Sequence, residues 1–149
     1  MNSRAVLALA VAAATFLQGC GAGSMLPSTS TSSHVPARSV VLQAGWELAA
    51  GEFNGYEATF TGGTVSATVD VTVQWTYAAN DVDVFVTTTT CTSDAFAAGG
   101  CSYVAKADGT ATKPEHLSFA LTASGTYRVY VANFGPGQES GTLEIGITQ

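Results

Sequence analysis

The sequence of 149 residues predicts an all-β protein whose folded part is an antiparallel β-sandwich, preceded by a signal peptide and a disordered linker. Three observations support this fold class. Several segments alternate apolar and polar residues with a period of two, which is typical of strands with one buried face. Clusters of Gly, Asn, Asp and Ser separate these segments, as expected for turns. Beyond the N-terminal apolar stretch, we find no segment with the apolar period of an amphipathic helix.

The longest alternating segment is TVSATVDVTVQW, residues 64–75, in which Val69, Val71 and Trp75 share one face. Roughly seven or eight short strands in about 110 residues bury one face each when two sheets pack together. A small barrel is the alternative, because periodicity does not reveal how the sheets close. Further strands are predicted at residues 81–86, 116–122, 126–134 and 141–148, with weaker candidates at 39–43, 57–61 and 101–106.

The β-sandwich domain is expected over residues 39–149, behind a linker that covers residues 20–38. The linker is rich in Ser, Thr, Gly and Ala and contains two prolines. Such a segment cannot bury enough apolar surface to offset the conformational entropy lost on ordering. We therefore predict a flexible tether, in which His34 is a solvated residue.

Residues 1–19 are predicted to be an export signal. Arg4 precedes a predominantly apolar run, which is shorter than the roughly 20 residues that a membrane-spanning helix needs. The end of the segment, Leu17-Gln18-Gly19-Cys20, resembles the lipobox of bacterial lipoproteins, although Gln18 departs from the commonest residue at its position. The resemblance implies cleavage before Cys20 and acylation of this cysteine, with palmitate among the expected fatty acids. Ordinary secretion, with Cys20 merely near the cleavage site, is the alternative.

The three cysteines are consistent with a lipid anchor. An odd number in an exported protein leaves one thiol to explain, and lipid on Cys20 leaves Cys91 and Cys101 as a pair. The residues between this pair, TSDAFAAGG, are mostly small and turn-forming, so a disulfide would stabilise the fold by about 2–3 kcal/mol. Metal binding by the pair is less favoured, because His34 and His116 are distant in sequence.

Two longer stretches resemble the bacterial pre-peptidase C-terminal domain. They are AANDVDVFVTTTT, residues 78–90, and LTASGTYRVYVANFGPGQESGTLEIGIT, residues 121–148. The family pattern places an acidic-apolar-acidic strand in mid-domain, here Asp81-Val82-Asp83, and a later Gly-Thr-Tyr turn, here residues 125–127. The resemblance implies a jelly-roll-like β-sandwich and an accessory role, either binding of substrate surfaces or assistance in folding and secretion. Some relatives bind calcium. This sequence departs from the usual setting, since no protease domain precedes the module.

The charge balance narrows the possible partners. The sequence holds 11 acidic and 5 basic residues, a formal net charge of −6, and loss of residues 1–19 removes one further positive charge, Arg4. Nucleic-acid binding requires basic patches, so no nucleic-acid partner is predicted. Attachment to a membrane then has to come from lipid on Cys20 and not from attraction to anionic headgroups.

No catalytic residues are predicted. A hydrolase needs a nucleophile, a base and an orienting group, and outside the linker only His116 is available as a base. We interpret His116 as an exposed residue at a strand edge. Asp81 and Asp83 project from the same face of one strand but stand about 7 Å apart. They form either a solvated edge or, with Asn80 or Asp70, a calcium site, since calcium takes several oxygen ligands. No other cofactor is predicted.

Ligand binding is the better hypothesis, and Phe85, Arg128 and Tyr130 are its candidates. Phe85 lies opposite the valines of its strand, while Arg128 and Tyr130 share one face of theirs. If the two strands are neighbours, the three side chains form an exposed platform suited to stacking on a sugar ring or gripping a peptide. The alternative is that a loop or the N-terminal strand covers Phe85 and Tyr130. Trp46 and Trp75 are expected in the core or at its boundary.

Together these predictions describe a lipid-anchored module of the bacterial cell envelope. The outer membrane is favoured, because Gly21 is not the Asp that retains lipoproteins at the inner membrane of enteric bacteria. The predicted function is non-catalytic binding of a polysaccharide or a protein. The alternative is a structural, assembly or secretion accessory factor that docks on an envelope partner through a sheet edge.

Overall fold

The computed structural model describes residues 35–61, 67–109, 113–121 and 123–149. Residues 1–19, Cys20 and nearly all of the segment 20–38 lie outside this part, so the signal peptide, the lipid anchor and the linker stay predictions. Within the described part, no helix is long and apolar enough to cross a membrane.

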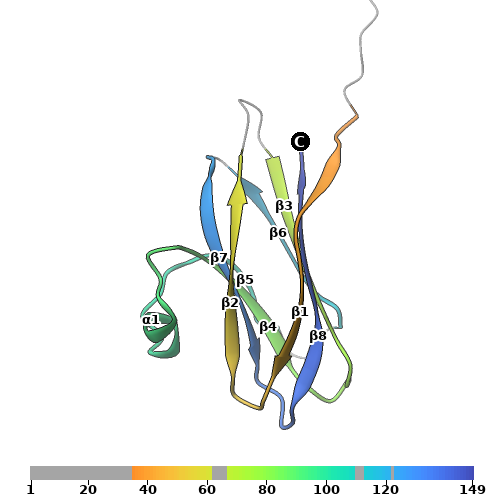
Figure 1. Cartoon of the computed structure of the whole chain (residues 1–149), viewed down its shortest axis with the longest axis vertical. Coiled ribbons are helices and arrows are strands. Elements are labelled where there is room, and N and C mark those ends of the chain that lie inside the picture. Colours follow the sequence, from red (N-terminus) through yellow and green to blue (C-terminus); the bar gives the residue numbers. More distant parts are fainter. Residues whose placement is uncertain (1–34, 62–66, 110–112, 122) are drawn as a thin grey trace, which may run out of the picture. The chain divides into compact units, whose positions relative to one another are not determined.

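Strands dominate the described chain and form two antiparallel sheets of four, ordered β1-β8-β3-β6 and β2-β7-β4-β5 (Figure 1). The pairs are nested: β1 pairs with β8, β2 with β7, β3 with β6 and β4 with β5. Such nesting is the jelly-roll arrangement. The predicted β-sandwich is confirmed and the barrel is wrong. In chain order the elements are β1 (Arg38–Leu48), β2 (Phe53–Phe60), β3 (Ala67–Trp75), β4 (Val82–Thr88), α1 (Ser93–Ala97), β5 (Tyr103–Ala107), β6 (Glu115–Leu121), β7 (Gly125–Asn133) and β8 (Glu139–Thr148).

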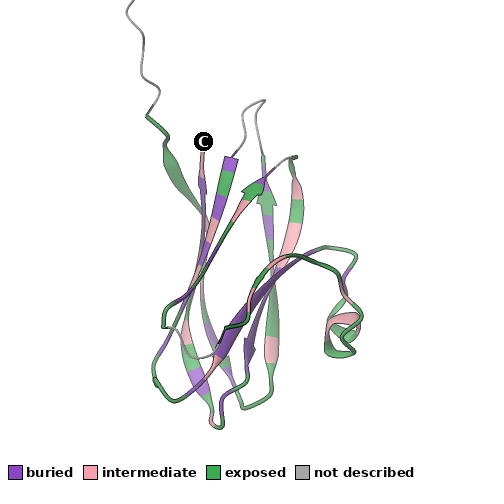
Figure 2. Ribbon diagram, turned by 180° about the vertical axis from the view of Figure 1, so that it is seen from behind, coloured by how far each residue is buried: buried purple, intermediate pink, exposed green. Residues whose placement is uncertain are grey.

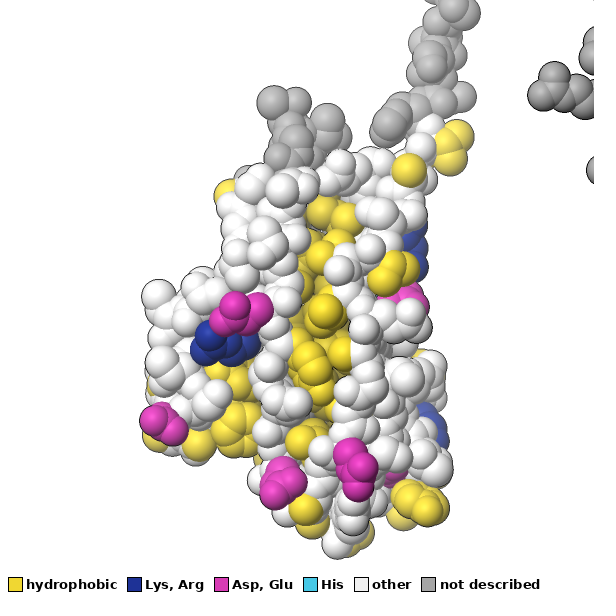
Figure 3. All heavy atoms as spheres, viewed as in Figure 1, with side chains coloured by type: hydrophobic (Ala, Val, Ile, Leu, Met, Phe, Trp, Pro, Cys, Tyr) yellow, Lys and Arg dark blue, Asp and Glu magenta, His cyan; other side chains and the backbone are white. Residues whose placement is uncertain are grey.

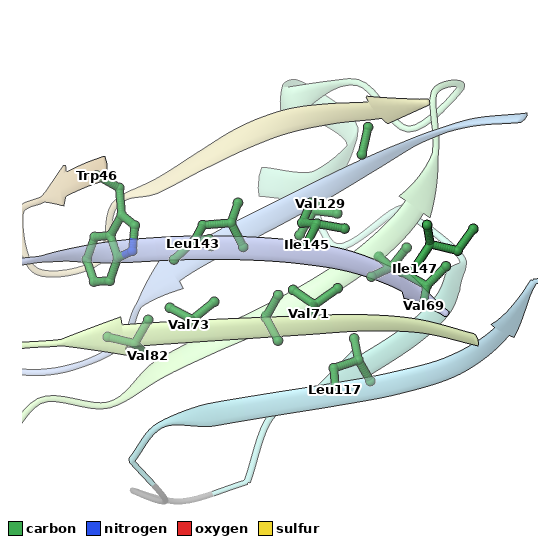
Figure 4. Packing of buried hydrophobic residues seen from close by; sticks show 14 of the residues in the cluster. Trp46, Val69, Val71, Val73, Val82, Leu117, Val129, Leu143, Ile145 and Ile147 are labelled. Carbon is green, nitrogen blue, oxygen red and sulfur yellow. The ribbon is translucent and has the colours of Figure 1, made fainter. Parts of the chain in front are cut away.

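The main core lies between the two sheets, where the alternation of the sequence places its apolar side chains. Val69, Val71 and Val73 of β3 are fully buried, as are Leu143 and Ile145 of the neighbouring β8 (Figure 4). Burying one such side chain contributes about 1.5–3 kcal/mol relative to leaving it in water. The polar residues that alternate with the β3 valines face away from this core.

Both tryptophans are buried in the core, as the sequence predicts. Trp46 of β1 and Trp75 of β3 stand opposite the same β8 residue, Gly141. A Cβ atom at Gly141 would lie 1.7 Å from the backbone oxygen of Gln74. Only glycine lets the three strands approach so closely here.

The first two strands and the helix differ from the sequence prediction. β1 has 11 residues and runs beyond the predicted 39–43, because Ala44, Trp46 and Leu48 continue the inward alternation. β2 begins at Phe53, ahead of the predicted residue 57. The sequence does not predict α1, since five residues are too few to show a helical period. Its N-terminus is capped by the Thr92 hydroxyl, which accepts a hydrogen bond from the Ala95 backbone N–H (3.2 Å).

A buried carboxylate, Glu139, joins the turn after β3 to the start of β8. Its Oε1 accepts hydrogen bonds from the backbone N–H groups of Thr76 (3.0 Å) and Ser140 (2.8 Å). Its Oε2 accepts from the backbone N–H of Tyr77 (2.9 Å) and from Asn80 Nδ2 (2.9 Å). Burial alone would raise the pKa of Glu139, but these hydrogen bonds outweigh it and hold the pKa below its ordinary value.

An apolar strip follows the seam between β1 and β2, which are edge strands of the two different sheets (Figure 3). Val41 and Leu42 of β1 and Tyr56 of β2 are only partly buried and pack against the core. Along this seam the two sheets therefore leave part of the core accessible to solvent.

Candidate functional site

Part of the outer face of the β2-β7-β4-β5 sheet, along β4 and the second half of β7, is buried, unlike an ordinary sandwich surface. Along β4, Val82, Val84 and Val86 face the core, whereas Asp83 and Phe85 face outward, yet all five are buried (Figure 2). A strand with one solvated face exposes every second residue. Another part of the chain therefore has to cover this face.

The cover is the segment between β4 and β5, which is closed by a disulfide between Cys91 and Cys101. This predicted disulfide is confirmed. The closed segment contains α1, whose Phe96 ring stacks on the Tyr130 ring of β7, with centroids 4.0 Å apart and planes 14° apart. The Cys91 carbonyl oxygen accepts hydrogen bonds from the Tyr130 hydroxyl (3.0 Å) and from Arg128 Nη1 (2.7 Å). The disulfide thus closes the cover, and stacking and polar contacts fasten it to the sheet.

The exposed platform predicted from Phe85, Arg128 and Tyr130 is wrong. β4 and β7 are neighbours, and Phe85 stands directly opposite Tyr130. However, the segment with α1 covers both rings, so Phe85 is 7% exposed and Tyr130 is 0% exposed. The Arg128 guanidinium is engaged with the Cys91 carbonyl and with the Glu57 carboxylate (2.5 Å). The alternative that a loop covers these rings is the correct one.

Beside this cover lies a pocket of about 290 Å³, here named the aromatic pocket. Phe85 is at the centre of its rings, with centroid distances of 5.1 Å to Tyr103, 5.4 Å to Phe96 and 6.5 Å to Phe134. Phe96 and Phe134 meet Phe85 at 66° and 75°, so the rings form steep walls and not one flat stack. Five rings from different parts of the chain line the pocket: Phe53 at the start of β2, Phe85 on β4, Phe96 on α1, Tyr103 at the start of β5 and Phe134 just after β7.

Besides the Tyr103 hydroxyl, the polar side chains of Asn133 and Glu52 line the aromatic pocket. Asn133 is fully buried, and its Nδ2 donates to three backbone carbonyls at 2.7–3.2 Å while its Oδ1 accepts from the Gly135 N–H (3.0 Å). The Asn133 side chain therefore has little capacity left for a ligand. Glu52 is exposed; its Oε2 accepts from the Ala49 N–H (2.9 Å), and its Oε1 accepts no hydrogen bond from the described residues.

Asp83 lies on the same face of the sheet and stands opposite Ala132, another residue of the pocket lining. Its side chain is buried, and Oδ1 has no hydrogen-bond partner among the described residues. Burial raises the pKa of Asp83 to about 7, and the charges of Asp81, Glu115 and Asp108 act in the same direction. The pocket thus stands beside a carboxyl group that titrates near neutral pH.

The calcium site at Asp81 and Asp83 stays a prediction. In the described parts of the chain, no group of three or more His, Cys, Asp or Glu side chains is arranged to hold a metal ion. Calcium bound to Asp83 would therefore need amide or backbone oxygens, or water, as its further ligands.

Two other features contain groups that could act in acid–base catalysis. His116 is exposed on β6, an edge strand of the other sheet, as the interpretation from the sequence expects. A second hollow of about 260 Å³ lies beside Tyr77 and contains two carboxylates. Both already accept hydrogen bonds within the protein, Glu47 from Gln138 and Glu139 from the turn after β3. Neither feature brings an unengaged acid and a base together.

Of the five pocket rings, the sequence singled out only Phe85. Phe96 carries a usable signal, because it is the one large side chain in the disulfide-closed stretch TSDAFAAGG and has to pack against something. Phe53, Tyr103 and Phe134 lie at strand ends beside turns, where no periodic pattern marks them.

No family model matches the sequence, and no curated protein sequence matches it. Among solved structures, PliG from Aeromonas hydrophila, a periplasmic inhibitor of g-type lysozyme, is similar at 17% identity over 71% of this chain and 84% of that chain, with a TM-score of 0.48. The pre-peptidase C-terminal domain of a collagenase from Bacillus anthracis is similar at 16% identity over 71% of this chain and 89% of that chain, with a TM-score of 0.43. At these identities and TM-scores, neither similarity establishes membership of a family.

Proposed function

We propose that the protein is a non-catalytic binding module of the bacterial cell envelope, anchored by lipid on Cys20, which receives part of a polysaccharide or of a protein in the aromatic pocket. The pocket carries this proposal. Its rim rings, Tyr103 and Phe134, keep 39% and 59% of their surface exposed, although the rings around them are packed. Rigid aromatic side chains offer a large contact area at a small cost in conformational entropy.

An envelope location is supported by the cysteines. Disulfides persist in oxidising compartments such as the periplasm and the cell surface. Since Cys91 and Cys101 are paired, Cys20 remains for the lipid. Intact mass spectrometry of protein purified from membranes tests the anchor: we expect cleavage before Cys20 with added acyl chains, and loss of both the acyl chains and membrane association in Cys20→Ala. An unmodified Cys20 would contradict the anchor.

A non-catalytic role is supported by the composition of the lining. Acid–base cleavage of a glycoside uses two carboxyl groups that face the substrate. Glu52 is the one carboxylate among the lining residues, since Asp83 is buried beside the pocket and is not part of its lining. The other polar side chain, Asn133, is held by bonds within the protein.

The binding role is tested with the full-length protein in detergent and its Phe134→Ala variant. Phe134 is exposed, so the variant is expected to fold, which circular dichroism checks. Envelope polysaccharides and detergent-extracted envelope proteins are immobilised separately, and retention of the protein is measured on each. We expect retention on one of them, with at least about tenfold weaker binding by Phe134→Ala. Thr68→Ala, on the outer face of the other sheet, is the matched control. Absent retention, or equal retention of Phe134→Ala, would contradict a binding role for the pocket.

The alternative, an assembly or secretion accessory factor, is favoured by the apolar strip between the edge strands β1 and β2 (Figure 3). Val40 of β1 is also 52% exposed. If a partner docks at this edge, Val40→Asp reduces complex formation in envelope cross-linking and leaves retention through the aromatic pocket unchanged. An unchanged cross-linking pattern would remove this alternative.

A further inference from the structure

The lining of the aromatic pocket suits one chemical class of ligand group. We propose, resting on the proposed function of this pocket as a ligand site, that the group it holds is a quaternary ammonium. The walls, the charge and the hydrogen-bonding capacity of the lining each contribute to this assignment.

The walls attract cations because the face of an aromatic ring carries negative partial charge. Phe96 and Phe134 meet the Phe85 ring at 66° and 75°, with centroids 5.4 Å and 6.5 Å from it. A compact group in the hollow between such walls touches more than one ring at once. A cation within about 6 Å of each centroid gains from every ring that it faces.

The charge of the lining also favours a cation. Glu52 is the one charged residue among the lining residues, and its Oε1 accepts no hydrogen bond from the described chain. Lys106 is the cross-strand neighbour of Phe85, but its Nζ is paired with Asp108 Oδ2 at 2.5 Å. An anionic ligand group would meet the Glu52 carboxylate without a free cation in the lining to balance it.

The hydrogen-bonding capacity of the lining distinguishes a quaternary ammonium from a primary amine or a sugar. The Asn133 side chain is engaged on both its nitrogen and its oxygen. A primary ammonium or a sugar hydroxyl would lose hydrogen bonds to water, and among the lining side chains only Glu52 and the Tyr103 hydroxyl could replace them. A quaternary ammonium presents methyl groups and donates no hydrogen bond, so it loses none on entry. The volume of about 290 Å³ lies just below the ~300–1,000 Å³ typical of ligand sites, and so suits a small group.

The test compares choline with dimethylbutanol, the uncharged isostere in which carbon replaces nitrogen. Both are titrated by NMR into the full-length protein in maltoside micelles, which contain no choline. We expect choline to bind at least about fivefold more tightly than the alcohol. Glu52→Gln removes most of this preference. Phe134→Leu keeps apolar bulk without an aromatic face, so it weakens choline binding more than alcohol binding. Thr68→Ala, on the other sheet, leaves both affinities unchanged.

Equal affinities for the two probes, or tighter binding of the alcohol, would overturn the proposal, as would choline binding that neither Glu52→Gln nor Phe134→Leu weakens. The two proposals also fail separately. Retention of envelope material that depends on Phe134 but is not competed by choline leaves the binding module and removes the quaternary ammonium. Choline binding without any retention of envelope material would leave the quaternary ammonium site and remove the envelope-binding module.

The same ammonium chemistry occurs in free compounds and in lipid headgroups. Sedimentation with phosphatidylcholine vesicles separates these sources when it is done with Cys20→Ala, which removes the contribution of the anchor. Co-sedimentation that requires Phe134 supports a headgroup ligand, and choline binding without co-sedimentation supports a free ligand.

Discussion

The outward residues of β3 and β4, one inner strand from each sheet, differ in burial. On β3, Thr68 and Gln74 are exposed and Asp70 and Thr72 are half-buried, whereas on β4 Asp83, Phe85 and Thr87 are all buried (Figure 2). At Phe85 the difference arises because the disulfide-closed segment with α1 covers this ring and Tyr130 beside it. The alternation of a strand thus predicts its inner face, while the path of another segment decides whether the outer face meets water.

The covered face also differs from the main core in how it is held together. The core between the sheets is mostly aliphatic, whereas the smaller cluster outside the second sheet combines Phe85, Cys91, Tyr130 and Ala132 with partly buried rings at a pocket. A cover made by one short segment leaves gaps at its rim, and the aromatic pocket is such a gap.

The largest loss of stability is expected when the Tyr130 ring, which lies under the cover, is removed. Tyr130→Ala removes the stack on Phe96 and the hydrogen bond to the Cys91 carbonyl, so we expect it to lower the free energy of unfolding by about 3–5 kcal/mol. The matched change on the uncovered face, Thr68→Ala, is expected to stay within about 0.5 kcal/mol. Urea unfolding measures both. Equal losses would show that the two outer faces do not differ in packing.

The next largest effect is expected at Asp83, whose pKa is raised to about 7, chiefly by burial. Between about pH 4 and pH 7 the folded protein holds this proton more tightly than the unfolded chain does, so stability falls as pH rises through this window. Asp83→Asn removes this loss and should stabilise the fold by up to about 4 kcal/mol above pH 7. The gain should vanish near pH 4. Urea unfolding at pH 4, 6 and 8 checks the trend, and a gain independent of pH would argue against a titrating Asp83.

Removal of the disulfide should open the cover without unfolding the main core. The Cys91→Ser/Cys101→Ser variant is expected to lose about 2–3 kcal/mol of stability and to bind a hydrophobic dye through Phe85 and Tyr130. Cys20→Ala is the matched control, since it removes a cysteine and leaves the disulfide intact. Unchanged dye binding in the double variant would show that stacking and hydrogen bonds alone hold the cover.

The smallest effect is expected at Glu139 of the first sheet. Its contribution to stability depends on pH in the direction opposite to that of Asp83. The pKa of Glu139 is held below its ordinary value, so its contribution is present above that value and is lost as pH falls. Glu139→Gln turns an amide donor toward backbone donors and should cost about 1.5–3 kcal/mol at neutral pH. The difference in the free energy of unfolding between Glu139→Gln and the wild type should become smaller at acidic pH. Parallel stability curves for the two proteins would contradict a role for the charge.

Much of the fold follows from local pattern. The alternation in residues 64–75 places Val69, Val71 and Val73 on one face, and the structure buries all three. The prediction fails where pattern is weak or short: β2 begins at Phe53, before any clear alternation, and α1 has only five residues. Propensity is informative over long windows and is overridden by tertiary contacts in short ones.

The sequence alone was enough to predict most strands and their inner faces, because these depend on the period of neighbouring residues. It also predicted the pairing of Cys91 with Cys101, on the condition that Cys20 carries the lipid. Only the tertiary structure decided that β4 is buried on both faces and that Phe53, Phe85 and Phe134 meet at one pocket. The sheet order β2-β7-β4-β5 brings their strands together from distant parts of the chain. A contact set by strand order and register leaves no mark in the residues on either side of each ring.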